Sequence, residues 1–585
     1  MVGTVVELRG ILTDSNDKVG RHIGNLWSKW NDARAPKMEE YKELRNYIYA
    51  TDTGTTSNAD LPWKNSTTRP VLTRIRDSLH ANYISTLFPN ENWLRWFGSS
   101  EKDQDKAKVI EAYMKDKAQQ SQLRQIVSQL LLDYIDFGMF FATARHVKEN
   151  WTLPNGRIVT GYDGPKAIRI SPLDIVFNPT APSFAAAPKI IRSVKNIGEL
   201  KALGETDENW QRAYEKTMNV RTNGSGFSVD DFQKAAGYSV DGFGDILEYY
   251  GSNLVEVLTF KGDYFDEDRG VLKKNQEMIV IDRGILVYSG ENRSWLGNGD
   301  IVSAGWRERT DNLYAMGPLD NLVGMQYRID HLENLKADAF DLMVHPILKI
   351  VGEVEPFTWG PGAHIEILGE GDVTELGANL QGVVTADNQI AILEQSMEEA
   401  AGNPKQAQGI RTPGEKTAFE VQSLDNASGR IFKEKTTNFE VNGLEPLLNL
   451  MLAEGRQNMS GRVSLRSIND QLGVEEFINL TPEDLVANGS IRPIGSRHFA
   501  EQSNLVQNLS QLSNTALGQM ILPHWSSEKI AELIADSLQL DRFGVFRKNV
   551  ALVEDAERTE LSNNLGQIVN ERSAATVEDE NELPQ

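Results

Sequence analysis

The stretch from Gly402 to Lys416 carries the residue types most suggestive of a chemical site. Glycine and proline break it, and Glu415 is its only acid. Its three cations are Lys405, Arg411 and Lys416. The ending Gly414-Glu415-Lys416-Thr417 is superficially similar to a nucleotide-binding loop, but no predicted strand precedes it and Glu415 stands where glycine is required. We therefore expect no ATP hydrolysis here. An ordinary polar surface loop explains the composition equally well, and Lys416 could belong to the following helix.

The sequence also lacks the motifs of other kinds of catalytic site. The chain has no cysteine, which excludes disulfides, thiolate metal sites and a cysteine nucleophile. No His-Glu-x-x-His or Gly-x-Ser-x-Gly sequence occurs, and the eight histidines form no ligand pair at helical spacing. The acidic stretch Asp263–Asp268 lacks the ligand spacing of a calcium loop. We expect neither metal, cofactor nor enzyme activity, although a hydrolase using paired carboxylates stays open because acids are abundant.

Two amphipathic helices and a β-rich insert precede this loop. The first helix is predicted from Gly317-Pro318 to His345-Pro346, since proline suits a first turn and ends a helix before it. The second is predicted over Asp387–Ala401 and returns antiparallel to the first. Residues 347–385 between them contain β-type runs at 347–351 and 364–368. The helices should pack through apolar stripes and expose acids on other faces. The predicted outward acids are Asp320, Asp330, Glu333, Asp338, Asp341, Glu394, Glu398 and Glu399.

The flanking regions predict a mixed α and β chain. Pro70 opens a helix that buries every fourth residue, and Asn155-Gly156 predicts a hairpin turn. A third long helix starts at Thr417, with kinks expected at Gly429, Gly443 and Pro446. Three arginines lie at the start of the helix that Pro70 opens, namely Arg69, Arg74 and Arg76. They either contact acidic neighbours or mark a nucleic-acid face. Further β-structure is predicted over 254–261, 277–288 and 463–480, and helices over 493–570.

Bulk composition gives a globular, acidic chain. Its 585 residues have a net charge of −23 and 40% hydrophobic residues, which suggests three or four domains with real cores. We expect neither a signal peptide nor a membrane span. Proteins that grip DNA neutralise phosphates with clustered cations, whereas a channel wall must let DNA slide. The acidity argues against the first and is compatible with the second, or with acids that merely solvate an outer surface.

The order of these elements resembles the portal proteins of tailed bacteriophages, podovirus-like ones in particular. The resemblance covers most of the chain and is one of pattern and order. Two stretches carry it, Met316-Gly317-Pro318 with Gln326–Asn334, and Gly409–Glu420. It implies an α+β fold with an α/β wing, a helical stem, a small β-rich clip and a helical crown, assembled into a ring that is typically a dodecamer.

The resemblance also implies a division of the chain. The expected regions are a wing over 1–310, a first stem helix over 311–345, a clip over 346–385, a second stem helix over 386–401, a tunnel loop over 402–416, a kinked helix and return to the wing over 417–492, a crown over 493–570 and a disordered acidic tail over 571–585.

Function and site residues follow from the same resemblance. A portal ring forms the channel at one capsid vertex through which double-stranded DNA is packaged and ejected. The implied partners are further copies of the chain, the large terminase subunit, tail adaptor or head-tail connector proteins, major capsid and scaffolding proteins, and DNA in transit, with no membrane. Its location is the virion, after assembly in the host cytoplasm. The implied DNA contacts are Lys405, Gln406, Gln408, Arg411 and Lys416; the implied channel-lining acids are Asp330, Glu333, Asp338, Glu394 and Glu398; the implied clip residues that bind partners are Trp359, His364, Glu366 and Glu370. The alternative is an acidic head-tail or capsid structural protein without a DNA channel.

Overall fold

The fold is mixed helix and sheet, the α+β class predicted from the sequence. The computed structural model describes residues 15–49, 65, 67–88, 93–104, 106–223, 253–266, 270–344, 347–354, 367–376, 380–402, 430–459, 463–469 and 474–494. The chain divides into two compact units. The larger contains residues 1–89, 93–462 and 481–493, and the smaller contains residues 90–92, 463–480 and 494–585.

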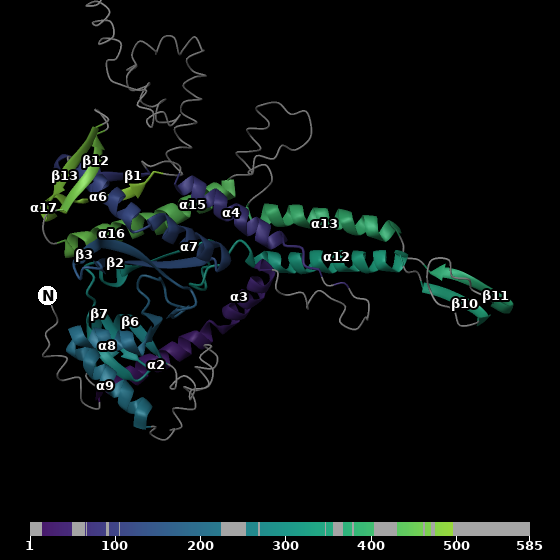
Figure 1. Cartoon of the computed structure of the whole chain (residues 1–585), viewed down its shortest axis with the longest axis horizontal. Helices are drawn as coiled ribbons and strands as arrows, with labels where there is room; N and C mark the ends of the chain where they lie inside the picture. Colours follow the sequence, from purple (N-terminus) through teal and green to yellow (C-terminus); the bar gives the residue numbers. More distant parts are fainter. Residues whose placement is uncertain are drawn as a thin grey trace, which may run out of the picture. The chain divides into compact units, whose positions relative to one another are not determined.

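An antiparallel five-stranded sheet, in the order β4-β5-β6-β7-β8, forms one core of the larger unit. Its strands are β4 (Ile175–Phe177), β5 (Lys189–Asn196), β6 (Leu254–Asp266), β7 (Val271–Ile281) and β8 (Ile285–Glu291). Helix α2 (Ser15–Ala33) packs Ile23 and Trp27 on one face, where Leu258 and Val280 meet them. Helices α8 (Ile197–Thr206) and α9 (Glu208–Asn223) cover the other face (Figure 1). Consecutive residues of β6 and β7 are buried on opposite faces of the sheet, which gives a three-layer arrangement.

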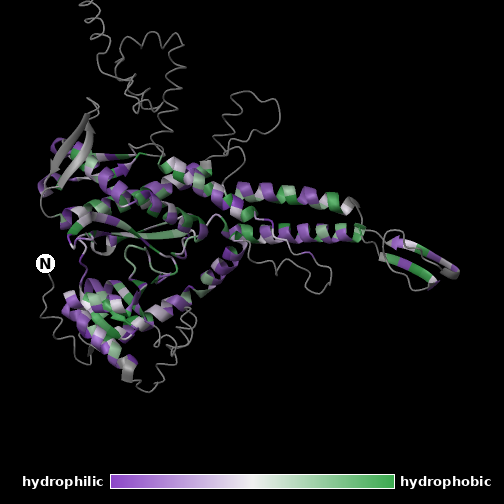
Figure 2. Cartoon of the chain, viewed as in Figure 1, coloured by the Kyte–Doolittle hydropathy of each residue, from purple (hydrophilic) through white to green (hydrophobic). Residues whose placement is uncertain are grey.

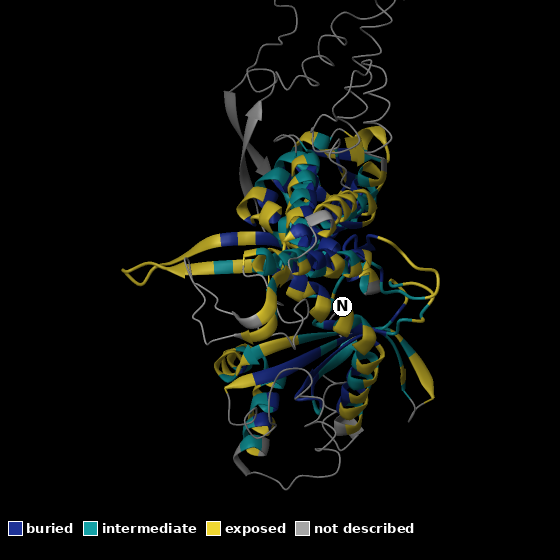
Figure 3. Ribbon diagram, turned by 90° about the vertical axis from the view of Figure 1, so that its right-hand side faces the viewer, coloured by how far each residue is buried: buried dark blue, intermediate teal, exposed yellow. Residues whose placement is uncertain are grey.

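A second core surrounds a three-stranded sheet in the order β3-β2-β9. Its strands are β2 (Met139–Thr152), β3 (Ile158–Ile170) and β9 (Ile301–Gly305). The predicted hairpin turn is confirmed, because the amide of Leu153 donates to the carbonyl of Arg157 and Gly156 has a φ of 77°. Buried residues fill the bases of β2 and β3, whereas residues 150–160 at their tip are exposed (Figure 3). Beside this sheet, β1 (Leu94–Gly98) pairs with β14 (Gly489–Pro493).

Helices surround this second sheet and share an aromatic core. They are α3 (Ala35–Ile48), α4 (Val71–Leu87), α5 (Glu101–Gln104), α6 (Ala107–Gln120), α7 (Leu123–Asp136), α15 (Arg430–Phe439), α16 (Glu445–Asn458) and α17 (Pro482–Leu485). Tyr134, Phe140 and Phe439 contact one another through their rings. The predicted burial of every fourth residue of α4 is confirmed from Val71 to Leu87.

The predicted break in the third long helix is confirmed at Gly443. A π-helical turn, Glu440–Leu444, separates α15 from α16. A Cβ at Gly443 would lie 2.4 Å from Cζ of Phe140, so only glycine admits that ring to the turn. The predicted start of this helix at Thr417 and the kink at Gly429 lie outside the described residues.

The two predicted stem helices are present and antiparallel. Helix α12 (Val323–Val344) follows a short 3-10 turn, Asp320–Leu322, and α13 (Leu380–Ala400) returns along it (Figure 1). Between them β10 (Ile347–Val354) and β11 (Ile367–Leu376) form an antiparallel hairpin. The second helix therefore begins earlier than Asp387, and the second β-run extends to Leu376, beyond its predicted end at 368. Polar and apolar residues alternate in patches along both helices in Figure 2, as amphipathic helices require.

The described part of the smaller unit is a single hairpin followed by Ile494. Strands β12 (Val463–Asn469) and β13 (Val474–Leu480) pair antiparallel, as the sequence predicted for this β-region. The predicted crown, the acidic tail and the tunnel loop lie outside the described residues. Among the helices that the structure describes, none is long and apolar enough to cross a membrane.

Candidate functional site

A strap lies along α12, and its residues up to Pro70 belong to no helix or strand. The strap consists of residue 65 and residues 67–72, just before and into the first turn of α4. Four of its backbone amides donate to side chains of α12. The pairs are Asn65 with Asp338 at 2.8 Å, Thr67 with Asn334 at 2.7 Å, Arg69 with Asp330 at 2.8 Å, and Leu72 with Gln326 at 3.2 Å. These four α12 side chains, called here the acceptor ladder, satisfy three amides that lie outside any helix or sheet and the amide of Leu72 in the first turn of α4, which has no partner within its helix.

The spacing of the ladder explains its fit to the strap. Its members are four residues apart on α12, a rise of ~6 Å along the helix axis. Two residues of extended backbone span ~6.6 Å, and Arg69, Thr67 and Asn65 are two apart. The distance between successive ladder residues on α12 therefore matches the distance between every second residue of the strap. The ladder contacts mainly the backbone of the strap, and the side-chain amide of Asn65 also donates to Asp338 at 2.9 Å and to Asp341 at 2.8 Å.

Two arginines link the strap and α4 to α13. The Arg69 guanidinium lies 3.0 Å from Glu394 and 3.8 Å from Glu333, while Arg74 lies 3.3 Å from Glu394 and 3.0 Å from Glu398. The arginine side chains are 43% and 53% exposed, whereas those of Glu394 and Glu398 are 10% and 5% exposed. We call these four residues the arginine clamp. Its cations are accessible to solvent, and its carboxylates are not.

These contacts correct the sequence-based placement of the stem acids. Asp330, Asp338, Glu394 and Glu398 were predicted to face outward and line a channel, yet all four are buried. Burial also raises the pKa of Asp330 above its ordinary value, while bonds from Gln326 and the Arg69 amide lower it. The outward placement is therefore wrong for these four acids. The physical reason is the strap, a segment distant in sequence that covers this face of α12 and α13.

Other predicted acids have different surroundings. Glu333 is half-buried and pairs with Lys336, which also lies 3.0 Å from Asp387 and so joins α12 to α13. Asp341 and Glu399 are exposed, as predicted. Asp320 accepts from Lys37 at 2.6 Å and is not a free acid.

The arginines at the start of α4 all contact acids of the same chain. Arg76 donates to both oxygens of Asp136 at 2.6 and 2.8 Å, and Arg69 and Arg74 belong to the clamp. The interpretation of these residues as partners of acidic neighbours is confirmed.

The predicted partner-binding residues are only partly described. Glu370 is exposed on β11. Trp359, His364 and Glu366 lie outside the described residues, as do all five predicted DNA contacts, Lys405, Gln406, Gln408, Arg411 and Lys416. Their roles therefore stay predictions.

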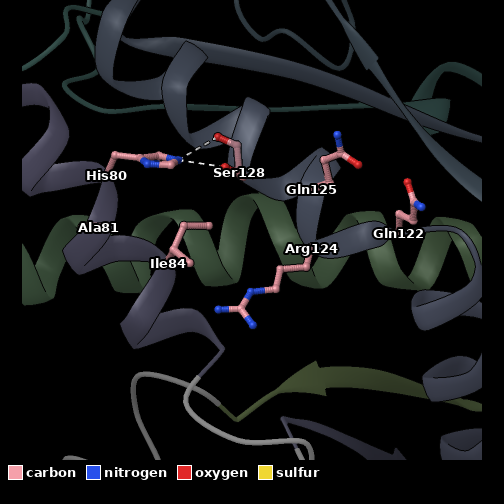
Figure 4. A pocket seen from close by; sticks show the side chains of 7 residues that line it. All are labelled: His80, Ala81, Ile84, Gln122, Arg124, Gln125 and Ser128. Atoms are coloured by element: carbon pink, nitrogen blue, oxygen red, sulfur yellow. Dashed lines mark hydrogen bonds between the residues drawn. The ribbon is translucent and has the colours of Figure 1, made fainter.

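A shallow groove between α4 and α7 is a further candidate (Figure 4). His80, Ala81 and Ile84 line it from α4, Arg124, Gln125 and Ser128 line it from α7, and Gln122 lines it just before α7 begins. Nε2 of His80 lies 2.9 Å from Oγ and 3.2 Å from the carbonyl oxygen of Ser128. Ser128 and His80 thus form a hydroxyl–imidazole pair, but none of the described residues that line the groove is an acid that could orient the imidazole. Over the described ranges, no group of three or more acidic or histidine side chains could hold a metal ion.

Buried charges across the five-stranded sheet escaped the sequence analysis. Lys189, Lys261 and Glu277 face one another in register on β5, β6 and β7, and all three are buried. Lys261 contacts Asp300, which the side chain of Asn292 also contacts. The only signal for these buried charges in the sequence was a charged residue within a strand that also contains apolar residues. Such a pattern is equally typical of an exposed sheet face.

The comparisons with known proteins identify no family for this chain. No protein-family model matches it, and no curated protein matches it.

Proposed function

We propose that this chain is a portal protein, a ring-forming and non-enzymatic conduit for double-stranded DNA at one vertex of a phage capsid. One observation carries the proposal: α12 and α13 run out and back as an antiparallel pair with the β10–β11 hairpin between them. Together with the interrupted helix α15–α16, this is the order of stem, clip, stem and kinked helix that the resemblance implies.

The β10–β11 hairpin supports assembly with further copies. It is a two-stranded sheet whose described side chains are exposed or half-buried, including Val351 at 53%. An isolated two-stranded hairpin is marginally stable in water. Neighbouring copies in a ring would cover this surface, and the exposed Glu370 would then lie at the proposed docking face for the terminase and later the tail adaptor.

The buried stem acids restrict how a channel could work. Side chains that accept hydrogen bonds from the strap or pair with the arginine clamp cannot also repel DNA from a channel wall. An acidic wall built from Asp330, Asp338, Glu394 and Glu398 is therefore not part of the proposal. The DNA contacts proposed for 405–416 remain, because their positive charge suits phosphate.

Electron microscopy of the purified chain, with native mass spectrometry of the same sample, tests the proposal. We expect a closed ring with an open central channel, and the mass gives the number of subunits. The measurement includes a second sample, assembled with capsid and scaffolding proteins, to detect a ring that closes only on a scaffold. A compact assembly without a channel under both conditions would contradict the proposal and favour a head-tail or capsid structural protein.

A further inference from the structure

Helices α12 and α13 are held by different kinds of contact to the strap and the start of α4. The acceptor ladder holds α12 through four hydrogen bonds to backbone amides, and three of its members are at most 3% exposed. The clamp holds α13 through the charged ends of Arg69 and Arg74, which are about half exposed. Buried hydrogen bonds respond weakly to salt, whereas exposed charges are screened.

We propose that the arginine clamp is releasable: its cations, Arg69 and Arg74, set the position of α13 on α12, while the acceptor ladder keeps α12 fixed to the strap. The clamp is a property of one chain, so it stands or falls separately from the DNA channel.

The burial of the glutamates makes the clamp a two-state device. Glu394 pairs with both arginines, so release of the arginines leaves its carboxylate at a buried position without either cation. A carboxylate in that state is strongly unfavourable. It regains hydration only if α13 shifts along or away from α12. Release of the arginines is thus coupled to movement of the helix.

The packing of α13 permits such a shift. Its buried apolar contacts come from Val383, Ile390 and Met397, roughly two turns apart, while Val384 and Ile392 are exposed. Lys336 and Asp387 form an ion pair between α12 and α13, in which Asp387 is 58% exposed. A helix with few buried apolar contacts, whose other contacts are ion pairs with exposed cations, can move by ~1–2 Å without loss of its fold.

Spin-label distances measured in the full chain test the clamp. The chain has no cysteine, so two introduced cysteines carry the only labels. One pair, Ala81→Cys with Ala391→Cys, reports α4 to α13. The other pair, Ala81→Cys with Leu335→Cys, reports α4 to α12. All three positions are exposed.

The deciding variant is Arg69→Gln with Arg74→Gln. It removes the clamp but keeps the Arg69 amide that donates to Asp330, so the ladder survives. We expect the α4–α13 distance to broaden and shift by at least ~1–2 Å, and the α4–α12 distance to stay unchanged. At 1 M salt, where the Debye length is ~3 Å, the unmodified clamp should show the same shift.

A matched control and a second variant complete the test. Arg309→Gln removes an exposed pair with Asp311 far along the chain and should change neither distance. Glu394→Gln keeps the side-chain volume but removes the buried charge that drives the movement, so its α4–α13 distance should stay close to that of the unchanged chain and respond less to added salt. Equal shifts of α12 and α13, or no shift of α13 in the double variant, would overturn the clamp.

Discussion

The backbone amide of Arg69 donates to Oδ1 of Asp330 at 2.8 Å, although 261 positions separate the two residues. Asp330 has no exposed surface, and the side-chain amide of Gln326 donates to both of its oxygens. The carboxylate of Asp330 therefore binds the strap and also orients Gln326, the neighbouring member of the acceptor ladder. The strap is held at its centre by a residue of α12.

Asp330→Ala should release the strap locally. The substitution leaves the Arg69 amide without its acceptor, at a cost of about 1–3 kcal/mol. Hydrogen exchange followed by mass spectrometry should show faster exchange over residues 65–72, with little change in the five-stranded sheet. Glu399→Ala is the matched control, since that acid is exposed and, among the described residues, its side chain accepts from Gln395 one turn away. Equal exchange in both variants would mean that Asp330 does not hold the strap.

The pH dependence of stability should reveal Lys189. Burial lowers the pKa of Lys189 to about 8; Asp300 raises it and Lys261 lowers it further. An unfolded chain keeps this proton up to the ordinary value of about 10.5. Between these values the unfolded state binds more protons, so the contribution of Lys189 to stability increases as the pH rises.

Lys189→Met tests this sign. The variant should be more stable than the parent at pH 7 by up to about 3 kcal/mol, and the advantage should shrink towards pH 10. Urea unfolding of both chains at several pH values measures the difference in their free energies of unfolding. The other titrating groups are common to both chains, so their contributions cancel from this difference. The expectation fails if the difference between the two chains is independent of pH.

The local pattern of the sequence predicted local structure well. In α4, Val71, Ile75, Leu79, Tyr83 and Leu87 follow a helical period, and all five are buried. Gly443 and Pro446 marked the break in the third helix, because glycine and proline constrain their own backbone. Such signals depend on neighbours within a few residues.

The sequence failed where distant segments meet. Asp330 and Glu398 have the period of an exposed acidic face, and nothing in α12 or α13 shows that residues 65–74 cover it. A ladder of polar residues at positions 326, 330, 334 and 338 was visible as a spacing of four, but it is equally typical of a solvated stripe. The identity of the covering segment is long-range information that helical periodicity does not contain.

Gly443→Ala should destabilise the junction of α15 and α16. The added methyl group would lie 2.4 Å from the Phe140 ring, and overpacking of this kind typically costs about 1–3 kcal/mol. Gly382→Ala in α13 is the matched control, because open space surrounds that position, and alanine there should stabilise the helix by about 0.5–1 kcal/mol. Thermal unfolding of the two variants should therefore shift in opposite directions. A double variant with Phe140→Leu should recover part of the stability; simple additivity would place the strain elsewhere.

Replacing Lys405, Arg411 and Lys416 together with alanine tests the proposed DNA contacts. Removing one cation from its phosphate should lower the slope of log affinity against log salt by about 1, because fewer counterions are released. The measurement is binding of double-stranded DNA by assembled rings over a range of salt concentrations. Alanine at the exposed Lys102, Arg157 and Lys201 is the matched control, since it removes the same charge from positions outside the proposed tunnel loop. We expect intact rings with a reduced slope in the first variant and an unchanged slope in the second. If the first variant instead fails to form rings, these cations belong to a subunit interface, and if both slopes fall equally, DNA responds to net charge and not to this loop.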